Sequence, residues 1–382
     1  MAVQNRHRAY RFRCYPTAEQ EQNLARTLGC VRLVYNKALD ARNKSWFRRR
    51  ERTTYAQTSA LLTKWKQRQD LAFLNEVSSV PLQQSLRNLQ KAFVNFWDRR
   101  AAYPVLKRKR FCGAAEYTKS AFTWKSGRLK LAKHAEPLDI RWSRRLPVGS
   151  EPTTVTVSRD AAGRWFVSML VEESISALPV SEESVGVDAG LNALFALSSG
   201  ELITNPRFER QDREKIRKLQ QELSRKRKGS ANWYKARLRL ARARARVADR
   251  RHDVLHKLST RLVRENQVIC VEDLNVRGML RNRSLAGAIA DASWSRFREM
   301  LEYKAEWYGR TLVVVDRFLP SSKTCSECGA LRGGMKLHQR TFSCPDPACG
   351  HVEDRDVNAA KNILAAGLAV AACGDGVRPK RA

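Results

Sequence analysis

The first half of the chain changes its hydrophobic period twice. Residues 8–15, RAYRFRCY, alternate basic and apolar positions, as expected for a half-exposed strand. A proline ends this run, and Thr17 followed by Gln20 has the sequence of a helix-capping box. From there to about residue 100, apolar residues recur at spacings of three and four, which predicts a helical block. Residues 117–175 then break into short strand-like pieces, which predict a small β domain. The first strand can pair with these later ones, which would make the helical block an insertion.

The second half of the chain alternates between strand and helix patterns. Residues 185–204 contain one apolar strand and two more strands around a Ser-Ser-Gly turn. Residues 207–265 have a helical period broken at Gly229, which predicts two antiparallel helices. A buried strand, a helix near 293–309, another strand and a last helix from about residue 356 follow. Three strands, helix, strand, helix, strand and helix is the element order of an RNase H-like fold.

Composition limits the class of protein. The 382 residues allow two to four domains, and 43% hydrophobic with 29% charged residues is typical of a folded soluble chain. The 72 Lys and Arg against 38 Asp and Glu give a formal charge of +34, which favours a polyanionic partner. A membrane is the rival partner, but the longest helical apolar run, residues 363–373, is shorter than the ~20 residues of a span. The start of the chain has no apolar signal core, so we expect no membrane partner and a cytoplasmic, nucleoid-associated location.

The positive charge is concentrated in a few stretches. Residues 207–265 contain 21 Lys or Arg but only seven Asp or Glu, about two-fifths of the excess. This stretch, the early strand and a cluster near residue 108 predict several phosphate-binding surfaces. Four aromatic residues among them, Tyr10, Phe12, Trp233 and Tyr234, either stack on bases or pack in the core. The candidate nucleic-acid contacts are Arg11, Arg13, Lys107, Arg108, Lys109, Arg110, Arg225, Lys226, Arg227 and Lys228.

Three acidic residues occupy the ends of predicted elements. Asp188 ends the first strand of the second half, Glu272 ends the strand Val-Ile-Cys-Val, and Asp356 lies at the start of the last helix. A carboxylate at the end of an apolar strand is costly unless a cation compensates its charge. Two Mg²⁺ or Mn²⁺ ions would do so, and such a pair can hydrolyse a phosphodiester. The three residues are therefore the candidate catalytic metal ligands.

Each of these acids also has a purely structural interpretation. Asp188 can be a turn residue, Glu272 can pair with an arginine, and Asp356 can cap its helix. Three further acids compete for the role, namely Asp273, Asp354 and Asp316. Of these, Asp354 is also a candidate helix cap, and Asp273 is expected on the opposite strand face from its neighbour Glu272. The joint occurrence of all three candidates in the right element order favours a metal site.

Four of the nine cysteines have metal-ligand spacing. Cys325 and Cys328 form one knuckle, and Cys344 and Cys349 form a second one, with 15 residues between the two knuckles. Four thiolates fill a tetrahedral Zn²⁺ site, so we expect one structural Zn²⁺ and no catalytic role for it. The second knuckle has four intervening residues where two are commoner. The remaining cysteines, Cys14, Cys30, Cys112, Cys270 and Cys373, are interpreted as small apolar residues, and His338 and His351 as spare ligands.

The order of these motifs resembles the TnpB (OrfB) family of insertion-sequence proteins almost from end to end. The start YRFRCYPTAEQEQNLARTLGCVRLVYN resembles the family's helix-turn-helix entry, and PLQQSLRNLQKAFVNFW resembles the next block. VGVDAGL, VEDLNVRGM, YKAEWYG, SSKTCSECG and DRDVNAAKNI resemble the nuclease half. This resemblance implies an RNA-guided DNA endonuclease, similar to a miniature type V CRISPR effector with a RuvC-like site. Its implied partners are a guide RNA from the transposon end and double- and single-stranded DNA. By this resemblance, Asp188, Glu272 and Asp356 match the family's metal ligands.

The resemblance also implies a domain plan. Residues 1–15 and 110–184 would form a wedge-like, barrel-like β domain, and residues 16–109 a helical recognition domain. Residues 185–320 and 350–382 would form the RuvC-like nuclease domain, with the basic hairpin 207–265 inside it. Residues 321–349 would be a zinc-finger insertion. We expect a monomer or weak dimer. The competing functions are a binding accessory factor or repressor without cleavage, and a DNA-only transposase.

Overall fold

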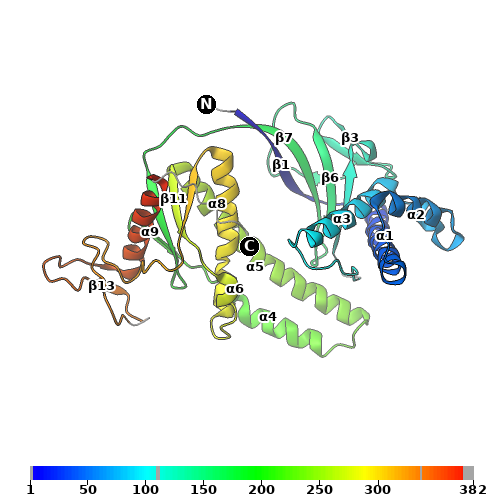
Figure 1. The fold of residues 1–382 in the computed structure, drawn as a ribbon. Helices are drawn as coiled ribbons and strands as arrows, with labels where there is room; N and C mark the ends of the chain where they lie inside the picture. Colours follow the sequence, from blue (N-terminus) through cyan, green and yellow to red (C-terminus); the bar gives the residue numbers. More distant parts are fainter. Residues whose placement is uncertain (1–2, 109–111, 336–337, 373–382) are drawn as a thin grey trace. The chain divides into compact units, whose positions relative to one another are not determined.

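The structure is a computed structural model that describes residues 3–108, 112–335 and 338–372. It contains two compact units, one spanning Asn5–Ser174 and the other beginning at Ile175. Figure 1 shows the elements of each unit. Among the residues that are described, no helix combines the length and the apolar character that crossing a bilayer requires.

The first unit is built on a five-stranded sheet with the order β2-β6-β7-β1-β5. Because β1 lies between β7 and β5, the helices that follow β1 in sequence are an insertion in this sheet, as the sequence indicated. A separate hairpin pairs β3 with β4. The strands are β1 (Val3–Cys14), β2 (Gly113–Thr118), β3 (Phe122–Lys125), β4 (Arg128–Leu131), β5 (Ile140–Arg141), β6 (Pro152–Arg159) and β7 (Trp165–Ser176).

The inserted helices bury one apolar stripe each. They are α1 (Ala18–Arg49), α2 (Tyr55–Gln67), the 3-10 helix η1 (Gln69–Asn75) and α3 (Ser79–Trp97); a one-turn 3-10 helix, η2 (Lys119–Ala121), precedes β3. The predicted capping box starts α1, where the Thr17 hydroxyl accepts from the backbone of Gln20 and the Gln20 side chain accepts in return. The predicted stripe of α3 is buried through Phe93, but its last member, Trp97, is 46% exposed. Tyr10 and Phe12 belong to the core, so base stacking by these two rings is excluded.

The second unit is built on a five-stranded sheet with the order β10-β9-β8-β11-β12. β8, β11 and β12 run parallel, and β9 and β10 are antiparallel additions. The strands are β8 (Ser184–Ala189), β9 (Ala193–Leu197), β10 (Leu202–Thr204), β11 (Val268–Glu272) and β12 (Thr311–Val315), and a small ribbon pairs β13 (Thr341–Ser343) with β14 (Val352–Asp354). The helices are α4 (Phe208–Ser224), α5 (Ala231–Glu265), α6 (Val276–Met279), α7 (Ala286–Ala292), α8 (Trp294–Tyr308) and α9 (Arg355–Ala372). The predicted order of strands and helices in this half is confirmed.

Alternation along the strands separates the two faces of this sheet. Ile269 and Val271 of β11 pack in a core with α5 and α8, whereas Cys270 between them packs with Ile363 of α9. The contact with α9 is close, because a Cβ at Gly186 of β8 would lie 2.0 Å from the carbonyl oxygen of Ala360. Only glycine allows this approach, and it fixes the start of α9 beside the end of β8.

Candidate active site and cysteine cluster

The strand parity brings the candidate acids to one face of the sheet. Asp188 lies two residues after Gly186, and Glu272 lies two residues after Cys270, so both side chains point to the face that α9 covers. β8 and β11 are parallel neighbours in which Val187 pairs with Val271, which places the two acids side by side at the strand ends. Asp356 enters from the first turn of α9. The three elements thus converge on one place.

The electrostatics of these acids reflect that convergence. Burial, followed by the charges of Glu272 and Asp356, raises the pKa of Asp188 to about 8. Burial also raises the pKa of Glu272 and, more than any other cause, that of Asp356. The three carboxyl groups are partly buried, and the charges of the other two oppose ionisation of Asp188. Binding of cations would lower this cost. Their hard oxygen atoms fit Mg²⁺ or Mn²⁺.

Two neutral or basic side chains contact the acids. The Ser321 hydroxyl donates a hydrogen bond to Glu272 Oε1 at 3.0 Å. The Arg340 guanidinium lies 3.5 Å from Asp356 Oδ2 and lowers the pKa of that carboxyl against the effect of burial. Neither contact was predicted from the sequence, because both residues come from the loop-rich segment around the cysteines.

The three competing acids have structural roles instead. Asp354 Oδ1 accepts from the backbone N–H of Asp356 and of Val357, so Asp354 caps α9. Asp316 Oδ1 accepts from the backbone of Phe318 in a turn. Asp273 forms ion pairs with Arg298 and Arg317, which lower the pKa of its carboxyl. The geometry therefore favours Asp188, Glu272 and Asp356 over their neighbours.

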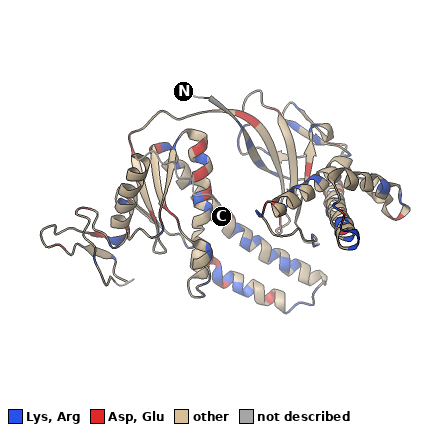
Figure 2. Cartoon of the chain, viewed as in Figure 1, with Lys and Arg blue, Asp and Glu red and all other residues tan. Residues whose placement is uncertain are grey.

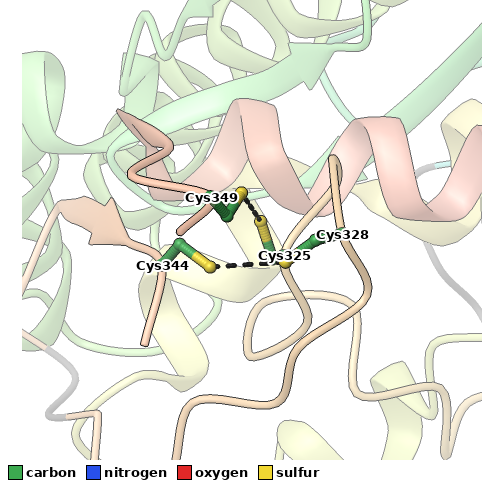
Figure 3. A group of neighbouring side chains, drawn as sticks. All are labelled: Cys325, Cys328, Cys344 and Cys349. Carbon is green, nitrogen blue, oxygen red and sulfur yellow. Dashed lines mark hydrogen bonds between the residues drawn. The ribbon is translucent and has the colours of Figure 1, made fainter. Parts of the chain in front are cut away.

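The four predicted zinc ligands form a tight cluster (Figure 3). The Sγ atoms of Cys325 and Cys349 are 3.9 Å apart, and those of Cys328 and Cys344 are 3.4 Å apart. Zn–S bonds of about 2.3 Å in a tetrahedron imply sulfur separations near 3.7 Å, and a disulfide would need about 2.05 Å. In the part of the chain that the structure describes, this is the one group of three or more metal-ligating residues whose donor atoms all lie within 4.8 Å. The donor set and spacing fit Zn²⁺.

The surroundings of the cysteines favour the thiolate at Cys325 but raise the pKa values of Cys344 and Cys349. Burial opposes ionisation of Cys325, but backbone hydrogen bonds from Cys328 and Glu327 lower its pKa to about 7. The longer second knuckle closes through a turn in which Asp346 donates its N–H to Cys344 Sγ at 3.4 Å. Gly329 and Gly350 follow the knuckles with positive φ of 77° and 61°. Cys14, Cys30 and Cys270 are buried as predicted, whereas Cys112 is exposed, and Cys373 lies outside the described residues.

The cysteine segment is tied directly to α9. Asn358 accepts from the Ser326 N–H at 2.9 Å and donates to the Thr324 carbonyl at 2.7 Å. Asn362 donates to the carbonyls of Ser321 and Thr324. The helix that carries Asp356 is thus held by the loop that leads into the first knuckle.

The basic candidates have mixed surroundings. Arg225, Lys226, Arg227 and Lys228 are all exposed between α4 and α5, and Figure 2 shows Lys and Arg along both helices. Arg11 stacks on Phe166 at 3.8 Å, Arg13 donates to the Trp165 carbonyl, and Lys107 lies 4.0 Å from the Tyr35 ring. Arg108 is exposed, and Lys109 and Arg110 lie outside the described residues. Tyr234 is 43% exposed and Trp233 half-buried, with their rings edge to face.

Comparison with known proteins identifies the family. Residues 166–283 match the family described as "Probable transposase" (OrfB of IS605), residues 294–363 match a Cas12f1-like TNB domain, and residues 1–51 match a helix-turn-helix domain. A "Putative RNA-guided DNA endonuclease" of Streptomyces pristinaespiralis is 60% identical over 99% of this chain and 94% of its own. InsQ of Escherichia coli K12, with the same description, is 32% identical over 98% and 96%.

A solved structure has the same fold. The protein in a Cas12f1–sgRNA–target DNA complex covers 94% of this chain and 99% of its own, with a TM-score of 0.58 at 12% identity. The fold is thus of the mixed α/β kind found in that effector. The chain belongs to the OrfB family of IS605-type insertion sequences. The residues matched as helix-turn-helix form β1 and the single continuous helix α1, because no proline or helix-ending turn interrupts residues 18–49.

Proposed function

We propose that this chain is a transposon-associated, RNA-guided DNA endonuclease with Asp188, Glu272 and Asp356 as its catalytic ligands. The observation that carries the proposal is their convergence from β8, β11 and α9 into one partly buried acidic site. The names of the full-length relatives support the activity and its guide. The second unit would be the RuvC-like, RNase H-like nuclease, and the sheet and helices of the first unit would be the wedge and recognition domains.

The chemistry is hydrolysis of a phosphodiester. A water oxygen attacks phosphorus, the bond to the leaving sugar oxygen breaks, and that oxygen takes up a proton. Two Mg²⁺ or Mn²⁺ ions held by the three acids would activate the water and stabilise the leaving oxygen. Asp188 is influenced by the charges of both other acids, and Ser321 orients Glu272 through its hydrogen bond. The three acids come from two strands and a helix, which are rigid elements suited to holding a site in place.

Nucleic-acid binding would use the exposed basic residues. The guide would come from the transposon end, and the target would be double-stranded DNA opened to single strands. The turn Arg225–Lys228 and the basic faces of α4 and α5 supply phosphate contacts in this proposal. The proposal also includes a cytoplasmic, nucleoid-associated location and a monomeric or weakly dimeric state.

The test compares two acid-to-amide variants of the full chain, each co-expressed with the element's own flanking DNA so that its RNA copurifies. Asp188→Asn should reduce Mg²⁺-dependent cutting of a matched target at least ~100-fold. The amide has no negative charge with which to hold the cation that stabilises the transition state. Target binding should stay within about twofold, since no phosphate contact is lost. Asp316→Asn is the matched control, because an amide oxygen can still accept from Phe318.

The outcomes separate the competing functions. Wild-type cutting by Asp188→Asn would contradict the site assignment. Wild-type protein that binds the target but never cuts it would favour the accessory factor. Strand-transfer products would favour the DNA-only transposase.

For the four cysteines we propose one structural Zn²⁺ per chain. The four sulfurs within 4.8 Å support it, and they leave no open ligand position. His351 is not needed as a ligand, since its Nε2 lies 3.5 Å from Glu353.

A further inference from the structure

The C-terminal parts of α1 and α3 enclose a cavity of about 360 Å³ in the first unit. This volume lies within the range of small-molecule sites, about 300–1,000 Å³. Its walls contain six aromatic side chains, Trp46, Phe47, Phe93, Phe96, Trp97 and Tyr103. Four of them are open to solvent, with exposed fractions of 39% for Trp46, 68% for Phe47, 46% for Trp97 and 38% for Tyr103. Such a group of exposed rings indicates a binding site more than a packing core.

A buried arginine lines the same cavity. Arg42 is only 5% exposed, and its Nη2 donates to Gln90 Oε1 at 2.6 Å. Its guanidinium carbon lies 4.9 Å from the centre of the Phe93 ring. The Nε–H of Arg42 is buried and finds no hydrogen-bond partner among residues 3–108, 112–335 and 338–372. A buried donor without an acceptor is costly, so a ligand that offers a carbonyl oxygen here would bind favourably.

The rim adds charge of both signs. Arg52 lies 5.7 Å from the ring of Trp97, and Arg50 lies 5.9 Å from the ring of Trp46. Glu51, paired with Arg49 at 3.2 Å, also lines the cavity. Aromatic faces beside arginines are the usual platform for a base of a single strand. A carboxylate repels phosphate but accepts a hydrogen bond from a ribose 2′-hydroxyl, which favours RNA over DNA.

We propose that this cavity binds one unpaired nucleotide of an RNA strand. The base stacks on the exposed aromatic rings, a base carbonyl oxygen accepts from the Arg42 Nε–H, and the ribose hydroxyl donates to Glu51. This anchor belongs to the first unit, whereas the acidic site belongs to the second, and it fixes one RNA nucleotide by its base instead of by its phosphate. It rests on the proposed function only for the source of the RNA.

The test measures binding without divalent cations, so it is independent of cleavage. The full chain is titrated into a short, unstructured, fluorescein-labelled RNA, the DNA of the same sequence, and the RNA made double-stranded. Trp97→Ala should weaken binding to single-stranded RNA by roughly 5- to 150-fold, the range for loss of one base–aromatic stack. Phe73→Ala is the matched control, since Phe73 is 41% exposed in the same unit but outside the cavity, and it should change affinity less than about twofold. Duplex RNA, whose bases are already paired, should bind equally to wild type and Trp97→Ala.

A second variant tests the role of Arg42, and a cross-linking experiment tests where the RNA contacts the chain. Arg42→Lys keeps the charge but lacks both the Nε–H and the Nη2 donor to Gln90, and it should weaken RNA binding more than Gln90→Ala, which removes only the contact with Gln90. Iodouridine-substituted RNA should cross-link to peptides that contain Trp46, Trp97 or Tyr103. Equal losses in Trp97→Ala and Phe73→Ala, or cross-links confined to other elements, would overturn the inference. Preferential loss of DNA binding would assign the cavity to a DNA strand and contradict the RNA proposal. If Trp97→Ala binds RNA normally while Asp188→Asn alone loses cutting, the cavity inference fails and the proposed function stands.

Discussion

The second unit contains two candidate metal sites that differ in how the chain builds them. The four cysteines come from one short segment, and their sulfurs lie close enough for a single tetrahedral ion. The three carboxylates come from two strands and a helix far apart in sequence, and their oxygens do not form a group within that distance. A local knuckle is specified by spacing alone, whereas the acidic site exists only when the whole sheet and α9 are in place.

The two sites also differ in what holds them without an ion. Backbone hydrogen bonds lower the pKa of Cys325, so this one cysteine is prepared as a thiolate, whereas the pKa values of Cys344 and Cys349 are raised. Burial raises the pKa of every acid in the other site, so the fold opposes its charged form. We therefore expect zinc to be a part of the folded structure, and the hard cations to exchange freely.

The largest effect should come from changing the acidic site alone. Glu272→Gln keeps the size of the side chain and an acceptor for Ser321 but removes its charge. Cleavage should fall at least ~100-fold, because the variant lacks the carboxylate charge that holds a cation at the reacting phosphate. A cutting assay with radioactive or fluorescent DNA measures this loss. Zinc measured by elemental analysis should remain at about one atom per chain. Loss of zinc in this variant would break the distinction between the two sites.

The next effect should come from the cysteines. Cys325→Ser should release the zinc and lower Tm by roughly 5 °C or more, because binding energy of a structural zinc is folding energy. Cutting should fall about tenfold as well, since α9 loses the anchor that Asn358 provides. Cys112→Ser is the control, because that exposed thiol is outside the cluster and its loss should leave metal and Tm unchanged. Full zinc content in Cys325→Ser would show that the cluster binds no metal through that sulfur.

A smaller effect concerns pH. The pKa of Asp188 in the fold, about 8, is above the usual value of 3.8, so the fold favours the neutral acid. Its stabilising contribution is present below pH 4 and is lost as pH rises towards 8. In EDTA, the Tm of Asp188→Asn should therefore exceed that of wild type by more at pH 8 than at pH 5, on the order of 2–4 °C for each kcal/mol. Added Mg²⁺ should narrow this gap by raising the wild-type Tm, and a gap that is the same at both pH values would argue against a buried titrating Asp188.

The smallest effect should come from the contact between Arg340, which belongs to the cysteine segment, and Asp356 of the acidic site. Arg340 lowers the pKa of Asp356, so Arg340→Gln should raise that pKa and move the acid limb of the cutting profile to higher pH. The shift should be less than about one pH unit, because Arg340 is half-exposed and solvent screens the pair. Lys in place of Arg340 should restore most of the profile. A uniform loss of rate at every pH would indicate a role other than this charge.

Much of this site could be predicted from residue type and position. Asp188 and Glu272 follow apolar strand residues at even spacing, and alternation then places both side chains on one face. The cysteine cluster follows from spacing alone. The contacts of Ser321 and Arg340 could not be predicted, because they depend on how an irregular segment folds over the sheet, and nothing periodic encodes that path.

The elements of the fold, too, could be predicted only where the sequence has a clear period. The long helices and apolar strands have clear periods and were predictable, including the break between α4 and α5. Strand β2 was not among the predicted strands, because GAAEYT has weak strand propensity and only Ala115 and Tyr117 face the core. It forms through its pairing with β6, a tertiary contact. The rings of α3 around the cavity do follow the helical period, but nothing in the sequence indicates that they face Trp46 of α1.

The hydrogen bonds between the cysteine loop and α9 bear on how inhibition by chelators is interpreted. Asn358 and Asn362 couple the loop to the helix that presents Asp356, so removing zinc would disturb the acidic site without touching its own ions. A strong chelator would then stop cutting by two routes, one fast and reversed by Mg²⁺, the other slow and reversed only when zinc is also restored. The time course of recovery would report on each metal separately.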